Sequence, residues 1–355
     1  MSSRADRVAA RLADAGVDCL LVASAVNLRY LTGFTGSNGL CVLGPGVRRF
    51  ATDFRYVERA RREVAGFDHE RAPRDFLAVL AGGWPDRPVR LGFEDQHVSV
   101  RTHARLRELL PERVELVAAG GLVERERAVK DAGELEAIAA AAALADDALR
   151  EVLAGGVAGR TERQVAAAID AALRRRGAEP SFEPIVAAGP NGSAPHAAPA
   201  DMPIPRDTLV TIDWGARLDG YCSDCTRTFA TGEVPDELRA IYDLVERAQA
   251  AALDAVRPGP SGREVDAVAR HMIGAAGHAE HFGHGLGHGV GLEVHEAPRL
   301  ATTADDALEP GNVVTVEPGV YVPGLGGVRI EDLVAVAPGG RRVLSGLGKA
   351  LTTVT

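Results

Sequence analysis

The stretch Thr208–Phe229, TLVTIDWGARLDGYCSDCTRTF, constrains the fold more than any other part of the chain. An apolar run, the turn signal Asp219–Gly220 and a second alternating run predict a β-hairpin. If the turn centres on these two residues, Asp224 pairs opposite Gly215 and points the same way as Asp213. Two carboxylates on one buried face repel each other unless a cation lies between them. Because carboxylates near turns are common, the hairpin alone leaves open whether these aspartates are ligands or ordinary turn-flanking residues.

The composition is that of a globular protein long enough for two domains. The chain has 355 residues, of which 46% are apolar and 25% charged, and its net charge is −9. No basic tract indicates nucleic acid, no apolar window is long enough for a membrane span, and the first residues lack the apolar core of a signal peptide. The four cysteines do not form a disulfide framework, and Cys222 and Cys225 lack the second pair of a zinc site. We therefore expect a cytoplasmic protein with no nucleic-acid or membrane partner.

Two different arrangements of helices and strands follow each other along the chain. Residues 1–122 alternate short strands and helices, which predicts an α/β domain with a mixed sheet. Residues 123–355 begin with a charged connector and hold two helix pairs, 134–177 and 237–277, each followed by strand-rich segments. This order predicts an α+β domain. A long loop rich in Pro and Gly precedes the hairpin and contains His196.

Histidines are concentrated in one part of the second domain. Six of the ten lie between His271 and His295. Two of them, His284 and His288, stand in GHGLGHGVG, whose five glycines rule out an ordinary helix and indicate backbone close to a ligand or another strand. A lone histidine is usually a hydrogen-bonded core residue, but this glycine-framed pair followed by His295 favours a site.

Two glutamates place further charges in apolar strands. Glu317 ends the strand VVTVE, and Glu331 is expected inside the strand GGVRIEDLVAV, on the same face as Arg329. With the two aspartates of the hairpin, four carboxylates interrupt buried strands, and each would cost several kcal/mol if left unpaired. Divalent metal is the simplest remedy, because four carboxylates and one imidazole can hold two ions if some carboxylates bridge. An oxygen-rich set favours Mn, Co, Fe or Mg over a structural zinc, and two adjacent metals suit hydrolysis.

Four motifs together resemble the pita-bread metallopeptidases, which include Xaa-Pro aminopeptidases, prolidases and methionine aminopeptidases. The motifs are IDWGARLDGYCSDCTRTF, HGLGHGVGLEVHE, VVTVEPGVY and GVRIED. The resemblance spans about residues 130–355 and implies a pita-bread catalytic domain with a dinuclear centre, in which Asp224 and Glu331 bridge the ions. Manganese is the expected metal, with cobalt, iron or zinc as alternatives. The residues that match the family's ligands are Asp213, Asp224, His288, Glu317 and Glu331.

The same resemblance implies roles for other polar residues that act on a proline-containing peptide. His295 would contact the scissile carbonyl or the oxyanion, His284 would lie beside the substrate's proline, and His196 would line the pocket. Glu317 would carry a proton from the nucleophilic water to the leaving proline nitrogen.

Further residues of the motifs are assigned by resemblance alone. Arg329 would orient Glu331 or neighbouring polar groups as part of the catalytic set, and Tyr321 would lie near the metals and the substrate. Cys225 stands where the motif usually carries an apolar residue, which weakens a metal or redox role for it.

The first domain distinguishes between the kinds of peptidase within the family. NLRYLTGFTGSNG followed by TDFRYVERA resembles the N-terminal domain of small bacterial Xaa-Pro peptidases, whereas methionine aminopeptidases need no such domain. The expected activity is therefore metal-dependent hydrolysis of Xaa-Pro bonds, at peptide N-termini or in dipeptides, by a homodimer.

Four alternatives stay open at this point. They are a methionine aminopeptidase, a metallopeptidase with another residue preference, a metal-free hydrolase like creatinase, and a catalytically dead binding module; the complete ligand set argues against the last two. Aminopeptidase and prolidase differ in whether the pocket closes after the proline carboxylate. The candidates for that closure in the first domain are Asn27, Arg29, Asp53 and Arg55.

Overall fold

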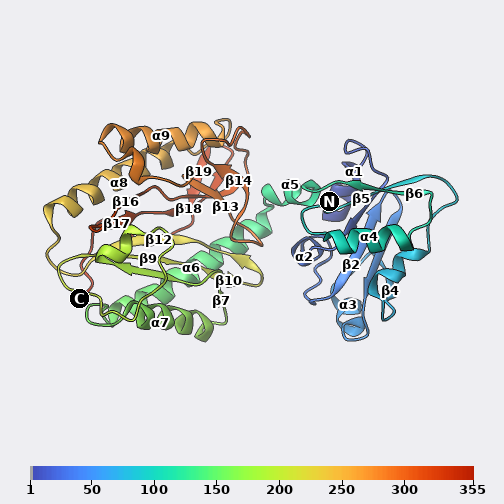
Figure 1. Cartoon of the computed structure of the whole chain (residues 1–355), viewed down its shortest axis with the longest axis horizontal. Helices are drawn as coiled ribbons and strands as arrows, with labels where there is room; N and C mark the ends of the chain where they lie inside the picture. Colours follow the sequence, from blue (N-terminus) through green and yellow to red (C-terminus); the bar gives the residue numbers. More distant parts are fainter. Residues whose placement is uncertain (1–2) are drawn as a thin grey trace. The chain divides into compact units, whose positions relative to one another are not determined.

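A computed structural model describes residues 3–355, which form two compact units (Figure 1). The first unit ends at Arg127 and the second begins at Ala128. Within the described part of the chain, no helix is long and apolar enough to cross a membrane.

The first unit is an α/β domain, as the alternation of its elements predicts. Its six-stranded mixed sheet has the order β4-β3-β2-β1-β5-β6. The short apolar runs form its buried strands, and β2 and β3 make the expected antiparallel hairpin. The strands are β1 (Cys19–Val22), β2 (Gly39–Gly44), β3 (Val47–Thr52), β4 (Asp68–Arg71), β5 (Val89–Phe93) and β6 (Val114–Ala118). The helices are α1 (Arg4–Ala10), α2 (Ala25–Thr32), α3 (Val57–Glu63), α4 (Val100–Leu109) and α5 (Leu122–Ala128), with a 3-10 turn at Phe76–Ala81.

The second unit places two helix pairs around its sheets. Asp131, Thr161 and Ser261 begin three of the helices, because each forms a capping box with a Glu or Gln three residues later. Figure 1 shows the pair α6 and α7 on one side of the strands and the pair α8 and α9 on the other. The helices are α6 (Ala132–Ala154), α7 (Glu162–Arg175), α8 (Asp236–Ala255) and α9 (Gly262–Ala275).

The two helix pairs pack mainly on different strands, although Ile138 and Ala142 of α6 also pack with Val313 and Leu333. The pair α6 and α7 covers the sheet β12-β9-β8, whereas α8 and α9 cover strands of the sheet β14-β13-β15-β18-β19 and of the ribbon β16-β17. A third small sheet has the order β11-β10-β7. The strands are β7 (Glu179–Pro180), β8 (Ile185–Ala188), β9 (Leu209–Trp214), β10 (Ala216–Leu218), β11 (Tyr221–Cys222), β12 (Cys225–Ala230), β13 (Gly287–Gly289), β14 (Glu296–Leu300), β15 (Val313–Val316), β16 (Gly319–Val322), β17 (Gly326–Arg329), β18 (Asp332–Ala337) and β19 (Gly340–Val343).

The predicted hairpin forms in the expected register but in two pieces. Leu218 pairs with Tyr221 across the turn, and the same register continues to Asp213 opposite Thr226. The hairpin is split at Gly215, where an added Cβ would lie 2.0 Å from the carbonyl oxygen of residue 223. The inner piece, β10 and β11, therefore belongs to a different sheet from the outer piece, β9 and β12.

Two expectations about strands are wrong. Glu331 does not lie inside a strand, because the chain leaves β17 at Arg329 and enters β18 of another sheet at Asp332. The segment before the hairpin is not all loop, since β8 pairs with β9. Its four residues are too few to show a strand period beside so many prolines and glycines.

Candidate active site

A cavity of about 370 Å³ in the second unit gathers nearly all of the residues expected to form a site. Of the ten expected residues, Tyr321 alone is absent from its lining. The nine that line the cavity are His196, Asp213, Asp224, His284, His288, His295, Glu317, Arg329 and Glu331.

Three carboxylates meet on one side of the cavity. Oxygen atoms of Asp213, Asp224 and Glu331 lie within 4.8 Å of one another. Asp213 Oδ1 and Glu331 Oε1 are buried and have no hydrogen-bond partner among the described residues. Burial and repulsion from neighbouring carboxylates raise the pKa of Asp224 and of Glu331 well above the usual range. Burial also raises the pKa of Asp213, although Arg329 opposes this.

His288 extends the cluster to a fourth carboxylate. Its Nε2 lies 3.5 Å from Asp224 Oδ2 and 3.3 Å from Glu317 Oε1. Its Nδ1 is 3.1 Å from the carbonyl oxygen of Gly289, which can only accept a hydrogen bond, so Nδ1 carries the proton. In the neutral ring the lone pair of Nε2 then faces two carboxylate oxygens. Either a proton or a metal ion is needed between these three atoms.

These observations fit a divalent metal. Four carboxylates gather near Arg329 in the cavity, and two of their oxygens are buried with no hydrogen-bond partner among the described residues. Carboxylate oxygens with an imidazole nitrogen are a common donor set for Mn, Fe, Co or Zn. The three carboxylates form one group of donors, and His288 with Glu317 forms a second; Asp224 adjoins both.

Arg329 links this cluster to a histidine across the cavity. It donates to Asp213 Oδ2 at 2.7 Å and to the Tyr321 hydroxyl at 2.9 Å. That hydroxyl is 3.0 Å from His284 Nε2, while His284 Nδ1 donates to the carbonyl of Gly285 at 2.7 Å. Burial lowers the pKa of His284, so its ring is neutral and accepts the Tyr321 proton. Because both ring nitrogens have partners, His284 has no free nitrogen to offer to a molecule in the cavity.

The remaining two histidines are more accessible. His295 is exposed at the cavity, and its ring packs edge-on against His288 with centroids 4.3 Å apart. Partial burial and the neighbouring His288 lower the pKa of His295, which keeps its ring neutral and able to donate one N–H. His196 is exposed on the segment after β8 and its 3-10 turn.

The structure adds residues that the sequence analysis did not single out. Thr226 donates to Glu331 Oε2 at 2.7 Å and accepts from Arg329 Nε at 3.0 Å. It stands two residues after Asp224, and this spacing on one strand face could have identified it. The cavity wall also includes Phe182 and Ile185, which offer no sequence signal of their own.

The candidates for pocket closure all lie in the first unit. Asn27 is fully buried there and donates to Glu94 and Glu124, both at 2.6 Å. Asp53 and Arg55 form a surface ion pair at 2.7 Å. The contacts of Asn27 therefore stabilise the first unit itself.

Comparisons with known proteins identify the family of each part of the chain. The model of metallopeptidase family M24 matches residues 136–338, and that of the creatinase/prolidase N-terminal domain matches residues 4–129. The chain is 41% identical over 338 residues to the uncharacterized peptidase YqhT of Bacillus subtilis (strain 168), covering 95% of this chain and 96% of that one.

Solved structures show the same architecture. The Xaa-Pro dipeptidase from Bacillus anthracis matches with a TM-score of 0.95, 37% identity and 99% of both chains covered. The X-Pro aminopeptidase from Thermotoga maritima MSB8 matches with a TM-score of 0.90 and 32% identity, covering 99% of this chain and 100% of that one. The expected combination of a creatinase/prolidase N-terminal domain with a pita-bread catalytic domain is confirmed, and the chain is a peptidase that belongs to metallopeptidase family M24.

Proposed function

We propose that the protein hydrolyses the peptide bond before proline with the help of two divalent metal ions. The observation that carries this proposal is the convergence of Asp213, Asp224, His288, Glu317 and Glu331 on one cavity that also contains three further histidines. The names of the relatives support the Xaa-Pro specificity, and the complete donor set favours an active metalloenzyme over a metal-free hydrolase or a binding module. We also propose a cytoplasmic homodimer.

The carboxylate group Asp213, Asp224 and Glu331 would hold one ion, and His288 with Glu317 the other, with Asp224 and Glu331 shared between them. Bound ions supply positive charge that polarises the scissile carbonyl and lowers the pKa of water. Manganese is our proposal for the metal, because the donors are mainly oxygen.

Glu317 is the proposed proton carrier. Its Oε1 accepts from the Thr315 hydroxyl at 3.0 Å and lies beside His288, so its position is held from two sides. Although burial opposes ionisation, the contacts with His288 and nearby positive charge lower the pKa of Glu317 to about 2. The ionised carboxylate can accept the water's proton and pass it to the proline nitrogen, which must be protonated to leave.

Each of the three remaining histidines would contact a different part of the substrate. His295 would donate its N–H to the oxygen that becomes negatively charged in the transition state. The ring face of His284 would pack against the apolar proline ring, and His196 would contact the peptide from the cavity mouth. Arg329 and Tyr321 would act by holding Asp213 and His284 in place.

Chelation tests the proposal directly. Cleavage of Ala-Pro and of Ala-Pro-Ala should stop after treatment with EDTA and return with Mn²⁺, whereas Ala-Ala should be cleaved poorly throughout. Activity that is indifferent to chelators would overturn the metal-dependent mechanism. The ratio of the two rates also decides between dipeptidase and aminopeptidase, because a pocket that closes after proline excludes the tripeptide.

A further inference from the structure

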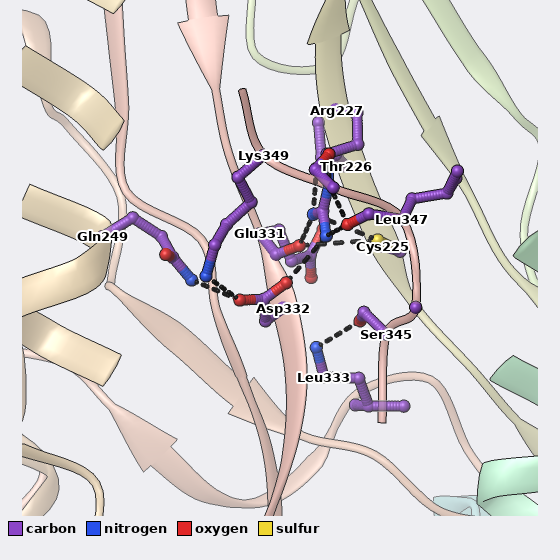
Figure 2. A network of polar contacts seen from close by, with 12 residues as sticks. Cys225, Thr226, Arg227, Gln249, Glu331, Asp332, Leu333, Ser345, Leu347 and Lys349 are labelled. Atoms are coloured by element: carbon purple, nitrogen blue, oxygen red, sulfur yellow. Dashed lines mark hydrogen bonds and ion pairs between the residues drawn. The ribbon is translucent and has the colours of Figure 1, made fainter. Parts of the chain in front are cut away.

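Glu331 lies in the short connection between β17 and β18, which belong to different sheets. Its backbone is therefore not held by the regular hydrogen bonds of a sheet. Instead its N–H donates to the carbonyl of Thr226 at 3.1 Å, and its Oε2 accepts from the Thr226 hydroxyl at 2.7 Å. Its own carbonyl accepts from Cys225 Sγ at 3.4 Å and from Arg227 Nη1. Three consecutive residues of β12 therefore hold this proposed metal ligand (Figure 2).

Arg227 is the charged member of this group and does not line the cavity. It is 2% exposed. Besides the Glu331 carbonyl, it donates to Asp332 Oδ1 at 2.8 Å, to the Leu347 carbonyl at 2.6 Å and to the Gly348 carbonyl at 3.1 Å. The planar guanidinium thus joins Glu331, the next residue and a segment near the C-terminus through one rigid group.

That segment, residues 345–349, is called the strap from here on. Lys349 donates to Asp332 Oδ2 at 2.5 Å, and Gln249 of α8 donates to the same oxygen at 3.0 Å. Asp332 is 1% exposed, and both of its oxygens have partners. Figure 2 shows these side chains converging on Asp332 from α8, β12 and the strap.

We propose that Arg227 and Asp332 are positioning residues, through which the strap sets the direction of the Glu331 carboxylate for metal binding. The inference rests on the proposed metal-dependent function. Glu331 Oε2 accepts from Thr226, and Oε1 is buried with no hydrogen-bond partner among the described residues. An oxygen of this carboxylate lies within 4.8 Å of oxygens of Asp213 and Asp224. The direction of Oε1 therefore depends on where the backbone of Glu331 lies, and Arg227 fixes that backbone from the far side of β12.

Stability alone is a weak reason for this network. Removing a guanidinium and a carboxylate from water costs free energy that their attraction only partly returns, and apolar residues of similar volume often stabilise a core as well. The network's hydrogen bonds instead determine the place of one residue that no sheet holds. Small displacements of groups that orient metal ligands typically weaken metal binding.

Titration of the metal-stripped, full-length protein with Mn²⁺ tests the proposal by calorimetry, together with melting temperatures before and after metal addition. The variants are Arg227→Met, Arg227→Lys and Lys349→Met. The matched control is Thr231→Val, which removes buried hydrogen bonds between the Thr231 hydroxyl and Thr208 beyond the other end of β12.

We expect Arg227→Met to weaken Mn²⁺ binding by about 10- to 100-fold. Lys349→Met should weaken it by a smaller factor, because Gln249 still holds Asp332. Arg227→Lys should stay weakened, since one ammonium cannot replace the planar fork. Thr231→Val should lower the melting temperature and bind Mn²⁺ as the wild type does.

Three results would overturn the inference. One is wild-type Mn²⁺ affinity in Arg227→Met with only a lowered melting temperature, and another is full recovery of affinity in Arg227→Lys. The third is unchanged Mn²⁺ affinity in Lys349→Met. Because Lys349 is partly exposed, this variant tests the inference even if Arg227→Met does not fold. Failure of the wild type to bind Mn²⁺ would instead overturn the proposed function itself.

Discussion

Thr226 connects two charged residues of the site with a single hydroxyl. It donates to Glu331 Oε2 and accepts from Arg329 Nε. The hydroxyl proton therefore points toward the carboxylate, and the oxygen lone pair faces the guanidinium. Hydrogen bonds to charged groups contribute about 1.5–3 kcal/mol each. The residue therefore contributes to the geometry of Glu331 without contributing a ligand of its own.

Replacing Thr226 by Val keeps the side-chain shape and removes the hydroxyl. We expect Mn²⁺ affinity to fall by about 10- to 100-fold, because Glu331 loses the partner that orients it. Calorimetric titration of the metal-stripped variant measures this, with Thr231→Val as the control for loss of a buried hydroxyl. Unchanged affinity would show that Glu331 is positioned by its backbone alone.

His295 is proposed to stabilise negative charge on the substrate and to bind no metal. His295→Ala should keep the metal content of the wild type and lower kcat by about 100- to 1,000-fold, the usual effect of losing one such donor. Metal analysis and steady-state kinetics on Ala-Pro check both parts. His271→Ala, on the exposed face of α9 and outside the cavity, should leave both unchanged. A wild-type kcat in His295→Ala would contradict the proposed role of His295.

At the scale of elements, the split hairpin brings the aspartates together. The turn is tight, because Asp219 and Gly220 both have positive φ, 47° and 85°, as a type I′ turn requires. The register then places Asp213 opposite Thr226, while the break at Gly215 lets the inner strands leave the sheet. The position of Asp224 therefore depends on close backbone approach at one glycine.

Gly215→Ala should move Asp224 and destabilise the second unit. The added Cβ would lie 2.0 Å from a backbone oxygen and 2.2 Å from Ser181 Oγ, and overpacking of this kind costs about 1–3 kcal/mol. We expect a lower melting temperature of the metal-free protein and weaker Mn²⁺ binding. Gly339→Ala, where no atom lies within 4 Å of the new Cβ, is the matched control. Equal behaviour of the two variants would contradict the argument.

At the scale of the whole molecule, the protein buries a cluster of carboxyl groups inside its catalytic unit. Burial and repulsion between carboxylates raise the pKa of Asp224 and Glu331 well above the usual range. The folded protein therefore keeps protons that the unfolded chain releases near pH 4, and its free energy of unfolding falls as the pH rises above that value. The lowered pKa of Glu317, about 2, acts in the opposite direction but only at more acidic pH.

Bound metal should remove this pH-dependent loss of stability, because the ions take the place of the protons on the carboxyl groups. We expect the difference in melting temperature between Mn²⁺-loaded and EDTA-treated protein to widen between about pH 5 and pH 8. Thermal scans across that range measure it. In Asp224→Asn, which has one carboxylate fewer, the difference should be small at every pH. A difference independent of pH in the wild type would contradict the proposed charge state.

Much of the site was predictable because its residues violate a local rule. Asp213 stands in the run LVTIDW, and Glu317 follows VVTV, so each is conspicuous as a charge in an apolar strand. The glycines around His284 and His288 likewise marked an unusual backbone. The register of the hairpin also followed from local turn chemistry, and the structure confirms it.

The sequence by itself determined which titratable groups the site contains, the order of most helices and strands, and how the hairpin pairs. Only the tertiary structure decided that Glu331 lies between sheets, that Thr226 orients it, and that the strap at residues 345–349 reaches it through Arg227. The physical reason is the distance along the chain over which each kind of interaction acts. Turn types, capping boxes and strand periods act within a few residues, whereas Arg227 and Leu347 meet across the fold because burial leaves a guanidinium few other acceptors.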